Sequence, residues 1–194
     1  MTAINKVAVI GAGVMGAGIA AQVSNAGLPV VLLDIVPEGA SNRNMVAEGA
    51  VQKMLKTNPA PFMHKRNAKR ITAGNIEDHL TWLADCDLVI EAVVEDLAVK
   101  QDLYRRIDQH RKNNAIVTSN TSTIPLARLV DGLADTFAQD FAITHFFNPP
   151  RYMRLLEIVA GQKTRQDAVQ ALREFGDRTL GKSVVECNDT PGFI

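Results

Sequence analysis

The sequence predicts an α/β fold built on a doubly wound, mostly parallel sheet. Short continuous apolar runs, which are typical of strands buried on both faces, alternate with longer segments of helical pattern. The first two apolar runs are joined by a glycine-rich turn and a helical segment, the pattern of a parallel strand–helix–strand unit. Two later runs lie close enough together to form a hairpin, which predicts antiparallel strands near the C-terminus.

The glycine-rich turn predicts a Rossmann-type dinucleotide site. It follows the apolar run 7–10 and reads Gly11-Ala12-Gly13-Val14-Met15-Gly16. In a G-x-G-x-x-G turn the first glycine permits the sharp turn and the second lets a pyrophosphate approach the backbone. The third lets the helix pack closely on the sheet. The free amides at the start of the following helix favour phosphate. Gly11, Gly13, Val14, Met15 and Gly16 are therefore candidate cofactor-binding residues.

Asp34 ends the second apolar run, 23 residues after Gly11. A carboxylate there can accept hydrogen bonds from both ribose hydroxyls and would oppose a 2′-phosphate, which favours NAD over NADP. One alternative is a glycine turn of another α/β domain, such as one that binds S-adenosylmethionine. A transmembrane helix over 7–33 is rejected because five glycines and Pro29 interrupt the apolar run.

The remaining elements follow from apolar runs and from glycine and proline breaks. Strands are expected at residues 7–10, 30–34, 70–73, 87–93, 115–119, 141–147, 154–160 and 183–187. Helices are expected at residues 14–26, 38–56, 96–112 and from Thr164, as N-cap, to about Leu180, with short pieces after His64 and Pro125. Asp189-Thr190-Pro191 looks like the start of a further helix.

The segment 38–70 is a helical excursion from the sheet, and its second half carries His64, Lys65, Arg66, Lys69 and Arg70. One interpretation is a solvated surface, and the other is a basic lip that faces a phosphate-bearing substrate.

Composition limits the partners. The 21 basic and 21 acidic residues balance, so neither nucleic acid nor an anionic membrane surface is indicated. Cys86 and Cys187 are far apart and lack metal-ligand spacing, so no metal site is expected. Two unpaired cysteines and no visible signal or transit peptide favour a reducing compartment and predict a cytoplasmic protein.

His145 and Glu157 are the candidate catalytic pair. If the turn between their strands is centred on Arg151, the two residues lie directly opposite each other and share one face. A carboxylate on one imidazole nitrogen would fix the tautomer and leave the other nitrogen as a general base. Such a base beside NAD suits the oxidation of an alcohol. The competing interpretation is a structural histidine between aromatic neighbours.

Polar residues at the carboxyl ends of strands add to this site. Ser122 could bond the reacting oxygen, or else serve only as a turn or cap. Asn148 could hold the histidine region or the nicotinamide ribose, or else be a simple turn residue. The segment 91–95 also lies at the carboxyl end of a predicted strand. His64, His79 and His110 lack this setting and are expected on the surface.

Several segments resemble, in this order, the NAD-binding domain of L-3-hydroxyacyl-CoA dehydrogenases: VAVIGAGVMGAGIA, IEAVVEDLAVKQDLY, SNTST, HFFNPP, LLEIVAG, GK-x-VV and C-x-DTPGFI. The resemblance covers essentially the whole chain. It implies oxidation of (S)-3-hydroxyacyl-CoA to 3-oxoacyl-CoA in fatty-acid β-oxidation. It also implies roles for individual residues. His145 would be the base and Glu157 its partner, and Ser122 would contact the substrate oxygen and the cofactor. Glu95, Lys100 and Asn148 would help to hold NAD, and Asp34 would bind the adenosine ribose.

The resemblance further implies that residues 1–194 form the NAD-binding domain and that a helical domain follows Ile194. In the family that second domain completes the active site and forms most of a homodimer interface, so the chain alone is expected to bind NAD but to turn over poorly. The parent could be a multifunctional β-oxidation protein. The excursion 38–70 resembles the helical arm that meets CoA, and a serine of that arm is replaced by Ala50 here.

Two rival functions remain. A dehydrogenase of another 3-hydroxy acid would share the glycine turn and Asp34, but would not be expected to carry the His145 segment with Glu157 twelve residues on. A structural protein related to the lens crystallins of this superfamily would keep the fold without the chemistry.

Overall fold

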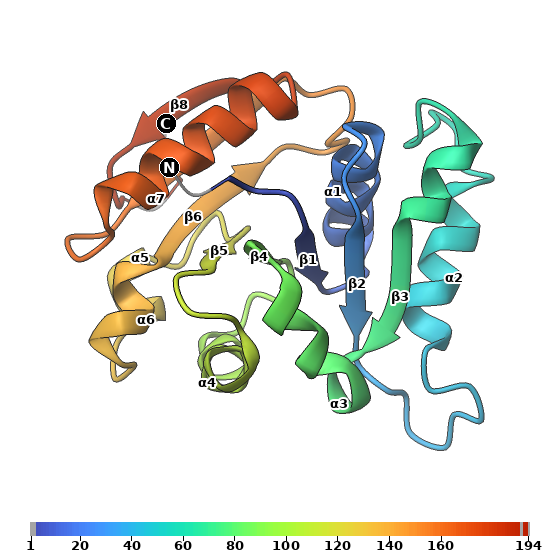
Figure 1. Cartoon of the computed structure of the whole chain (residues 1–194), viewed down its shortest axis with the longest axis horizontal. Coiled ribbons are helices and arrows are strands. Elements are labelled where there is room, and N and C mark those ends of the chain that lie inside the picture. Colours follow the sequence, from blue (N-terminus) through green and yellow to red (C-terminus); the bar gives the residue numbers. More distant parts are fainter. Residues whose placement is uncertain (1–2, 191, 194) are drawn as a thin grey trace.

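The structure, a computed structural model, describes residues 3–190 and 192–193. The strands of this part form one sheet in the order β3-β2-β1-β4-β5-β6-β7-β8 (Figure 1). Their bounds are β1 Val7–Ile10, β2 Val30–Asp34, β3 Ile71–Asn75, β4 Leu88–Glu91, β5 Ile116–Ser119, β6 Phe141–Phe146, β7 Leu155–Ala160 and β8 Ser183–Cys187.

The strands from β3 to β6 all run parallel to one another. β7 is antiparallel to β6, and β8 is parallel to β7. The predicted fold class is therefore confirmed, including the change of direction near the C-terminus. The order reverses between β1 and β4, the switch point at which doubly wound sheets bind ligands.

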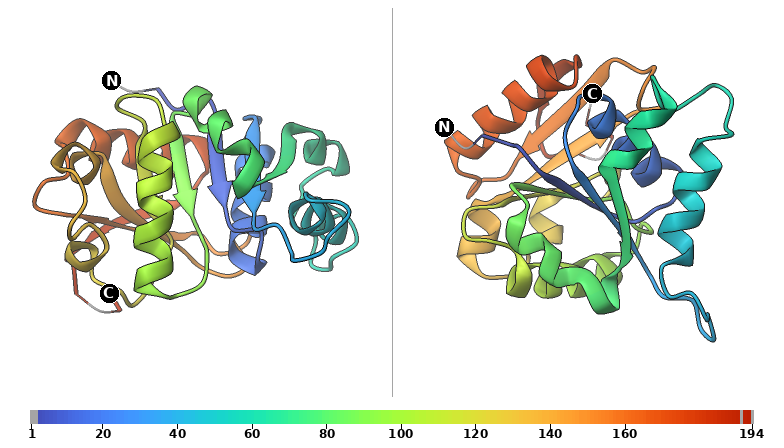
Figure 2. Two further views of the ribbon diagram at one scale, coloured as in Figure 1. Left: turned by 90° about the horizontal axis from the view of Figure 1, so that it is seen from below. Right: turned by 45° about the vertical axis from the view of Figure 1, so that its right-hand side comes forward.

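Helices cover both faces of the sheet (Figures 1 and 2). Buried side chains of α1, α2 and α7 pack into one apolar core, and those of α3, α4, α5 and α6 pack into the core on the other face. The helix bounds are α1 Val14–Asn25, α2 Met45–Met54, α3 Ile76–His79, α4 Leu97–His110, α5 Leu126–Leu129, α6 Asp135–Gln139 and α7 Gln166–Glu174. Shorter helical pieces are the 3₁₀ helices η1 Lys65–Arg70 and η2 Leu80–Asp85 and the π-helical turn η3 Phe175–Thr179.

The predicted helix 38–56 is shorter than expected, because α2 begins only at Met45. Residues before it form turns: Gly39 has a φ of +71°, and the Asn42 side chain accepts the backbone amide of Asn44. These local bonds satisfy the backbone outside a helix, so the polar stretch does not extend the helical pattern.

Thr164 is not the N-cap of α7, which is Arg165. The Thr164 hydroxyl instead donates to the Phe141 carbonyl and accepts the Gly161 amide, which closes the turn after β7. The helix then passes into the π-helical turn η3 and ends before Gly181, whose φ is +66°.

Asp189 was predicted to begin a helix of its own, but its side chain caps α5 instead. Its carboxylate accepts the amides of Leu126 and Ala127 at the start of α5. The remainder of that predicted helix start includes Pro191, which lies outside the described residues. Among the described residues, none of the helices is both long and apolar enough to cross a membrane.

Candidate active site

The glycine turn has the geometry expected of a dinucleotide loop. Gly11 has a φ of +102°, and a Cβ there would overlap the backbone of Ala92. A Cβ on Gly16 would overlap the Gly11 carbonyl, so the helix lies directly against the turn. At Gly13, the N-cap of α1, a Cβ would meet nothing within 4 Å. The turn therefore offers open space beside the amino end of a 12-residue helix.

Asp34 lies at the end of β2, beside this turn. Its carboxylate accepts the backbone amides of Ala12, at 2.5 Å, and Ile35, at 2.6 Å. The side chain is half-buried. It therefore ties the second strand to the glycine turn while remaining accessible to a ligand.

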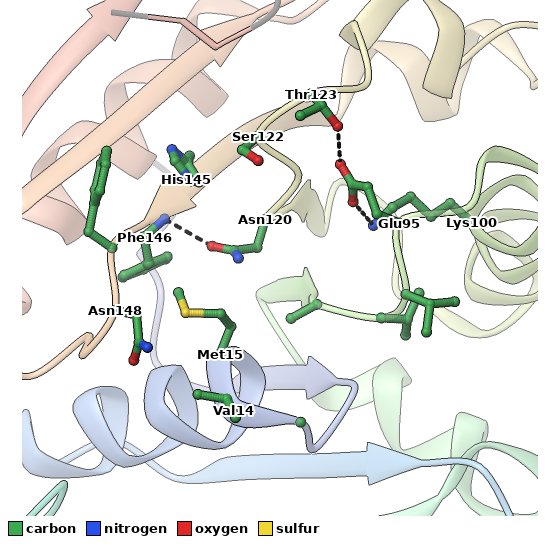
Figure 3. A pocket seen from close by; sticks show the side chains of 15 residues that line it. Val14, Met15, Glu95, Lys100, Asn120, Ser122, Thr123, His145, Phe146 and Asn148 are labelled. Carbon is green, nitrogen blue, oxygen red and sulfur yellow. Dashed lines mark hydrogen bonds and ion pairs between the residues drawn. The ribbon is translucent and has the colours of Figure 1, made fainter.

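A cavity of about 580 Å³ extends from the glycine turn to the carboxyl ends of β4, β5 and β6 (Figure 3). It contains most of the residues that the sequence predicts for the site. Its lining includes Gly13, Val14, Met15, Glu95, Lys100, Asn120, Ser122, His145 and Asn148. The other predicted residues do not line the cavity. Gly11 and Gly16 form the two ends of the turn, Asp34 bonds to the turn at Ala12, and Glu157 contacts His145.

His145 and Glu157 are directly paired across β6 and β7. The His145 Nδ1 lies 2.5 Å from the Glu157 Oε2, and the Glu157 side chain is only 1% exposed. The Cys187 thiol lies 3.9 Å from the other carboxylate oxygen. The predicted contact is therefore confirmed, and the imidazole is oriented through Nδ1 so that Nε2 is the nitrogen available for a proton.

Lys100, which the family resemblance places among the residues that hold NAD, is almost completely buried. Its ammonium lies 2.7 Å from Glu91 and 3.3 Å from Glu95. Burial raises the pKa of Glu95, but hydrogen bonds from Thr121 and Thr123 and the Lys100 charge outweigh it, so the pKa lies below its usual value. Lys100 thus reaches the cavity as the partner of two carboxylates.

Sequence analysis places the segment 91–95 at a strand end but assigns no anchoring role to Glu91, and it assigns none to Asn120. Asn120 accepts the Phe146 amide and so joins the loop after β5 to the strand that carries His145 (Figure 3). Glu91 is a fully buried carboxylate at the end of β4. The signal in the sequence was that Glu91 follows the apolar run 88–90. A carboxylate buried at the end of such a strand needs several hydrogen-bond donors.

A second cavity, of about 470 Å³, lies between α1, α2 and the turn that joins β6 to β7. Its walls are mainly apolar, and it shares Gly13, Val14 and Asn148 with the first cavity. Lys53 and Ala50 line it, whereas the basic residues of 64–70 line neither cavity. The alternative of a basic lip formed by residues 64–70 is therefore not supported at either cavity, and the basic residues among the described lining of the second cavity are Lys53 and Arg151.

The remaining histidines and Cys86 lie outside this site, whereas Cys187 contacts Glu157. His64 is exposed, but His79 and His110 are half-buried, and His79 packs on Trp82 and accepts the Asn75 amide. Cys86 and Cys187 are free thiols. Among residues 3–190 and 192–193, no group of three or more side chains could hold a metal ion.

The fold and the glycine-turn cavity define a Rossmann-type, NAD-binding domain of a dehydrogenase. Residues 6–190 match the model of the 3-hydroxyacyl-CoA dehydrogenase, NAD binding domain. The chain belongs to the 3-hydroxyacyl-CoA dehydrogenase family, and its cofactor is NAD.

Similar proteins are longer than this chain. A probable 3-hydroxyacyl-CoA dehydrogenase of Deinococcus radiodurans is 48% identical over 98% of this chain, which spans 55% of that protein. A putative fatty acid oxidation complex trifunctional enzyme of Rickettsia felis is 47% identical over 98% of the chain, which spans 26% of it. The crystal structure of 3-hydroxybutyryl-CoA dehydrogenase from Escherichia coli K12 superposes with a TM-score of 0.83 at 32% identity, covering 98% of this chain and 39% of that one.

Proposed function

We propose that this chain is the catalytic NAD-binding part of an enzyme that oxidises (S)-3-hydroxyacyl-CoA to 3-oxoacyl-CoA in fatty-acid β-oxidation. The observation that carries the proposal is the buried Glu157 carboxylate, 2.5 Å from the His145 imidazole at the edge of the glycine-turn cavity. The family and the relatives' names support this substrate class.

The cofactor fits the residues present. The open face of Gly13 and the first amides of α1 would hold the diphosphate, and Asp34 would hold the adenosine ribose. The nicotinamide half then lies toward Glu95, Ser122, His145 and Asn148, at the other end of the cavity. When bound, NAD⁺ supplies the hydride acceptor for the alcohol carbon.

His145 would take the hydroxyl proton through Nε2. Glu157 accepts from Nδ1–H, which fixes the tautomer, and its carboxylate stabilises the imidazolium that forms. Ser122, half-buried beside His145, would donate to the substrate oxygen as negative charge develops there (Figure 3). No other step is needed from the protein, because the electron pair leaves with the hydride.

The second cavity supports an acyl-CoA substrate. It joins the cofactor cavity at Val14 and Asn148, and its apolar walls suit the thioester chain of such a molecule. Lys53 and Arg151 at its edge would favour the phosphates of CoA. The free thiols of Cys86 and Cys187 support a reducing compartment, and we propose the cytoplasm.

The test is reduction of NAD⁺ by the complete protein in the presence of 3-hydroxybutyryl-CoA, longer 3-hydroxyacyl-CoAs and free 3-hydroxybutyrate. The CoA thioesters should be oxidised and the free acid should not. Preference for the free acid would instead support a dehydrogenase of another 3-hydroxy acid. His145→Gln should lower kcat by about a thousandfold or more while NAD⁺ affinity stays within about twofold. Undiminished turnover in this variant would rule out His145 as the base.

The relatives are much longer than this chain, so we expect it to bind NAD⁺ with little turnover on its own. Steady-state activity equal to that of a full-length relative would contradict this expectation. We further propose that the complete protein is a homodimer, to be measured by sedimentation.

A further inference from the structure

Glu91 is bonded on both carboxylate oxygens although its side chain is fully buried. Its Oε1 accepts the Val93 amide and the Lys100 ammonium, each at 2.7 Å. Its Oε2 accepts the Tyr104 hydroxyl at 2.6 Å and the Ser119 hydroxyl at 2.7 Å. Four donors, from the loop after β4, from α4 and from β5, therefore converge on one carboxylate directly behind the cofactor cavity.

These bonds continue into the two loops that form the cavity wall. Lys100 also pairs with Glu95, and Glu95 accepts the Thr123 hydroxyl (Figure 3). Glu95 accepts the Thr121 hydroxyl as well. The Thr121 amide in turn donates to the Ser119 hydroxyl. A closed ring of bonds thus joins the loop 92–95 to the loop 120–123. Because both loops line the cavity, the shape of that wall depends on Glu91.

The ring carries one net negative charge, from two carboxylates and one ammonium. A buried ion pair is weak evidence for stability, because desolvation offsets much of the attraction between the charges. The same low dielectric lets the remaining charge act on a ligand in the adjoining cavity more strongly than it would through water. NAD⁺ carries a positive charge on its nicotinamide ring, whereas the ring of NADH is neutral.

We propose that Glu91 is a positioning residue that holds the nicotinamide end of the cavity and biases it toward oxidised over reduced cofactor. Through Lys100 and Ser119 it fixes Glu95 and the Ser122 loop, and its charge leaves the ring net negative. This inference goes beyond the proposed function, because it depends on cofactor binding and not on the substrate or on His145.

The test is the ratio of two dissociation constants, Kd for NAD⁺ over Kd for NADH. It is measured in the unaltered protein, in Glu91→Gln, in Lys100→Met and in the double variant. Glu91→Gln removes one negative charge and should raise the ratio by about three- to tenfold. Lys100→Met removes the positive charge and should lower the ratio by a similar factor, while Val93, Tyr104 and Ser119 still donate to Glu91. The double variant keeps one negative charge, on Glu95, and should return the ratio to within about twofold of the starting value.

Two further variants separate charge from packing. Tyr104→Phe removes one bond to Glu91 without changing charge, so both constants should rise together and the ratio should stay the same. Asp140→Asn is the matched control, since Asp140 is another buried carboxylate, paired with Arg111 and Arg165 at the opposite end of the sheet. It should lower stability and leave both constants unchanged.

Equal shifts of both constants in Glu91→Gln and Lys100→Met, with an unchanged ratio, would overturn the proposal. A ratio that moves the same way in both variants would overturn it as well. If Glu91→Gln does not fold, Lys100→Met decides alone, and its ratio must fall. Failure of the proposed substrate assignment would appear only in the turnover assay, with these ratios intact.

Discussion

The three glycines of the cofactor turn have different physical roles. A side chain on Gly11 or Gly16 would overlap main-chain atoms, whereas one on Gly13 would extend into open space. The first two positions are therefore constrained by folding, and Gly13 is constrained by the ligand. This division agrees with the separate roles that the sequence pattern predicts for the three positions.

Gly13→Ala and Gly16→Ala should accordingly separate binding from stability. Gly13→Ala should leave the melting temperature almost unchanged and weaken NAD⁺ binding by about tenfold or more, because the new methyl group occupies the diphosphate space. Gly16→Ala should lower the free energy of unfolding by about 3 kcal/mol through overlap with the Gly11 carbonyl. Calorimetry measures the unfolding of each variant, and titration with NAD⁺ measures its binding. Tight NAD⁺ binding by Gly13→Ala would place the diphosphate elsewhere.

Cys86 should be inert toward thiol reagents at neutral pH. Burial raises the pKa of its thiol to about 11, so the reactive thiolate is scarce until the pH approaches that value. The pKa of Cys187 is also raised, by burial and by the Glu157 carboxylate, but this thiol is only partly covered. We expect Cys187 to react first at pH 8, with Cys86 protected until the chain unfolds. Mass spectrometry after alkylation locates the label, and early labelling of Cys86 would contradict the expectation.

At the scale of elements, the helical excursion is fastened to the hairpin that carries His145. Arg151 donates to the carbonyls of Ala60 and Phe62, and the Tyr152 hydroxyl donates to Ala60. Both residues belong to the connection between β6 and β7, and both line the second cavity. The position of the segment 58–62 is thus set by side chains of the hairpin.

Arg151→Ala should therefore loosen the segment 58–63. We expect backbone amides there to exchange with solvent about tenfold faster, because the Phe62 carbonyl loses the Arg151 donor and the Ala60 carbonyl keeps only Tyr152. Tyr152→Phe removes the bond to Ala60 and a longer one from Arg151 but leaves Arg151 on both carbonyls, so it should have a smaller effect. Amides of α4 serve as an internal reference. Unchanged exchange in 58–63 would show that the segment is held by its other contacts.

The elements also show what could be predicted from the sequence. The pairing of His145 with Glu157 followed from the turn centre alone, because hairpin register is a local property. The partners of Glu91 could not be predicted in this way, since they come from a helix and a neighbouring strand whose relative placement depends on packing. Two predictions were wrong: that a helix begins at residue 38 and that Thr164 is an N-cap. In both places side-chain hydrogen bonds to nearby backbone replace the expected helical bonds.

At the scale of the whole molecule, one sheet separates two apolar cores. Leu32 and Leu33 are neighbours on β2, both fully buried, yet they belong to opposite cores. Each core rests on the same strands, so loss of packing on one face removes support from the other. Apolar runs predicted this arrangement well, because strands buried on both faces have no polar alternation.

Leu32→Ala and Leu33→Ala should each destabilise the chain by about 2–5 kcal/mol. Both variants should unfold in a single transition that probes of either face report at the same midpoint, because the cores share one sheet. Denaturant unfolding followed by circular dichroism and by the fluorescence of Trp82 tests this. Two separate midpoints in either variant would show that the cores unfold independently.

The antiparallel pairing of β6 with β7 has a consequence for changes far from any functional side chain. Insertion or deletion of one residue in the connection 147–154 would shift the pairing, and a shift by one position turns every side chain of a strand to the other face. Glu157 would then leave His145 although neither residue had been altered. The length of a surface connection is thereby a chemical parameter of this protein, as much as the identity of the base that we propose.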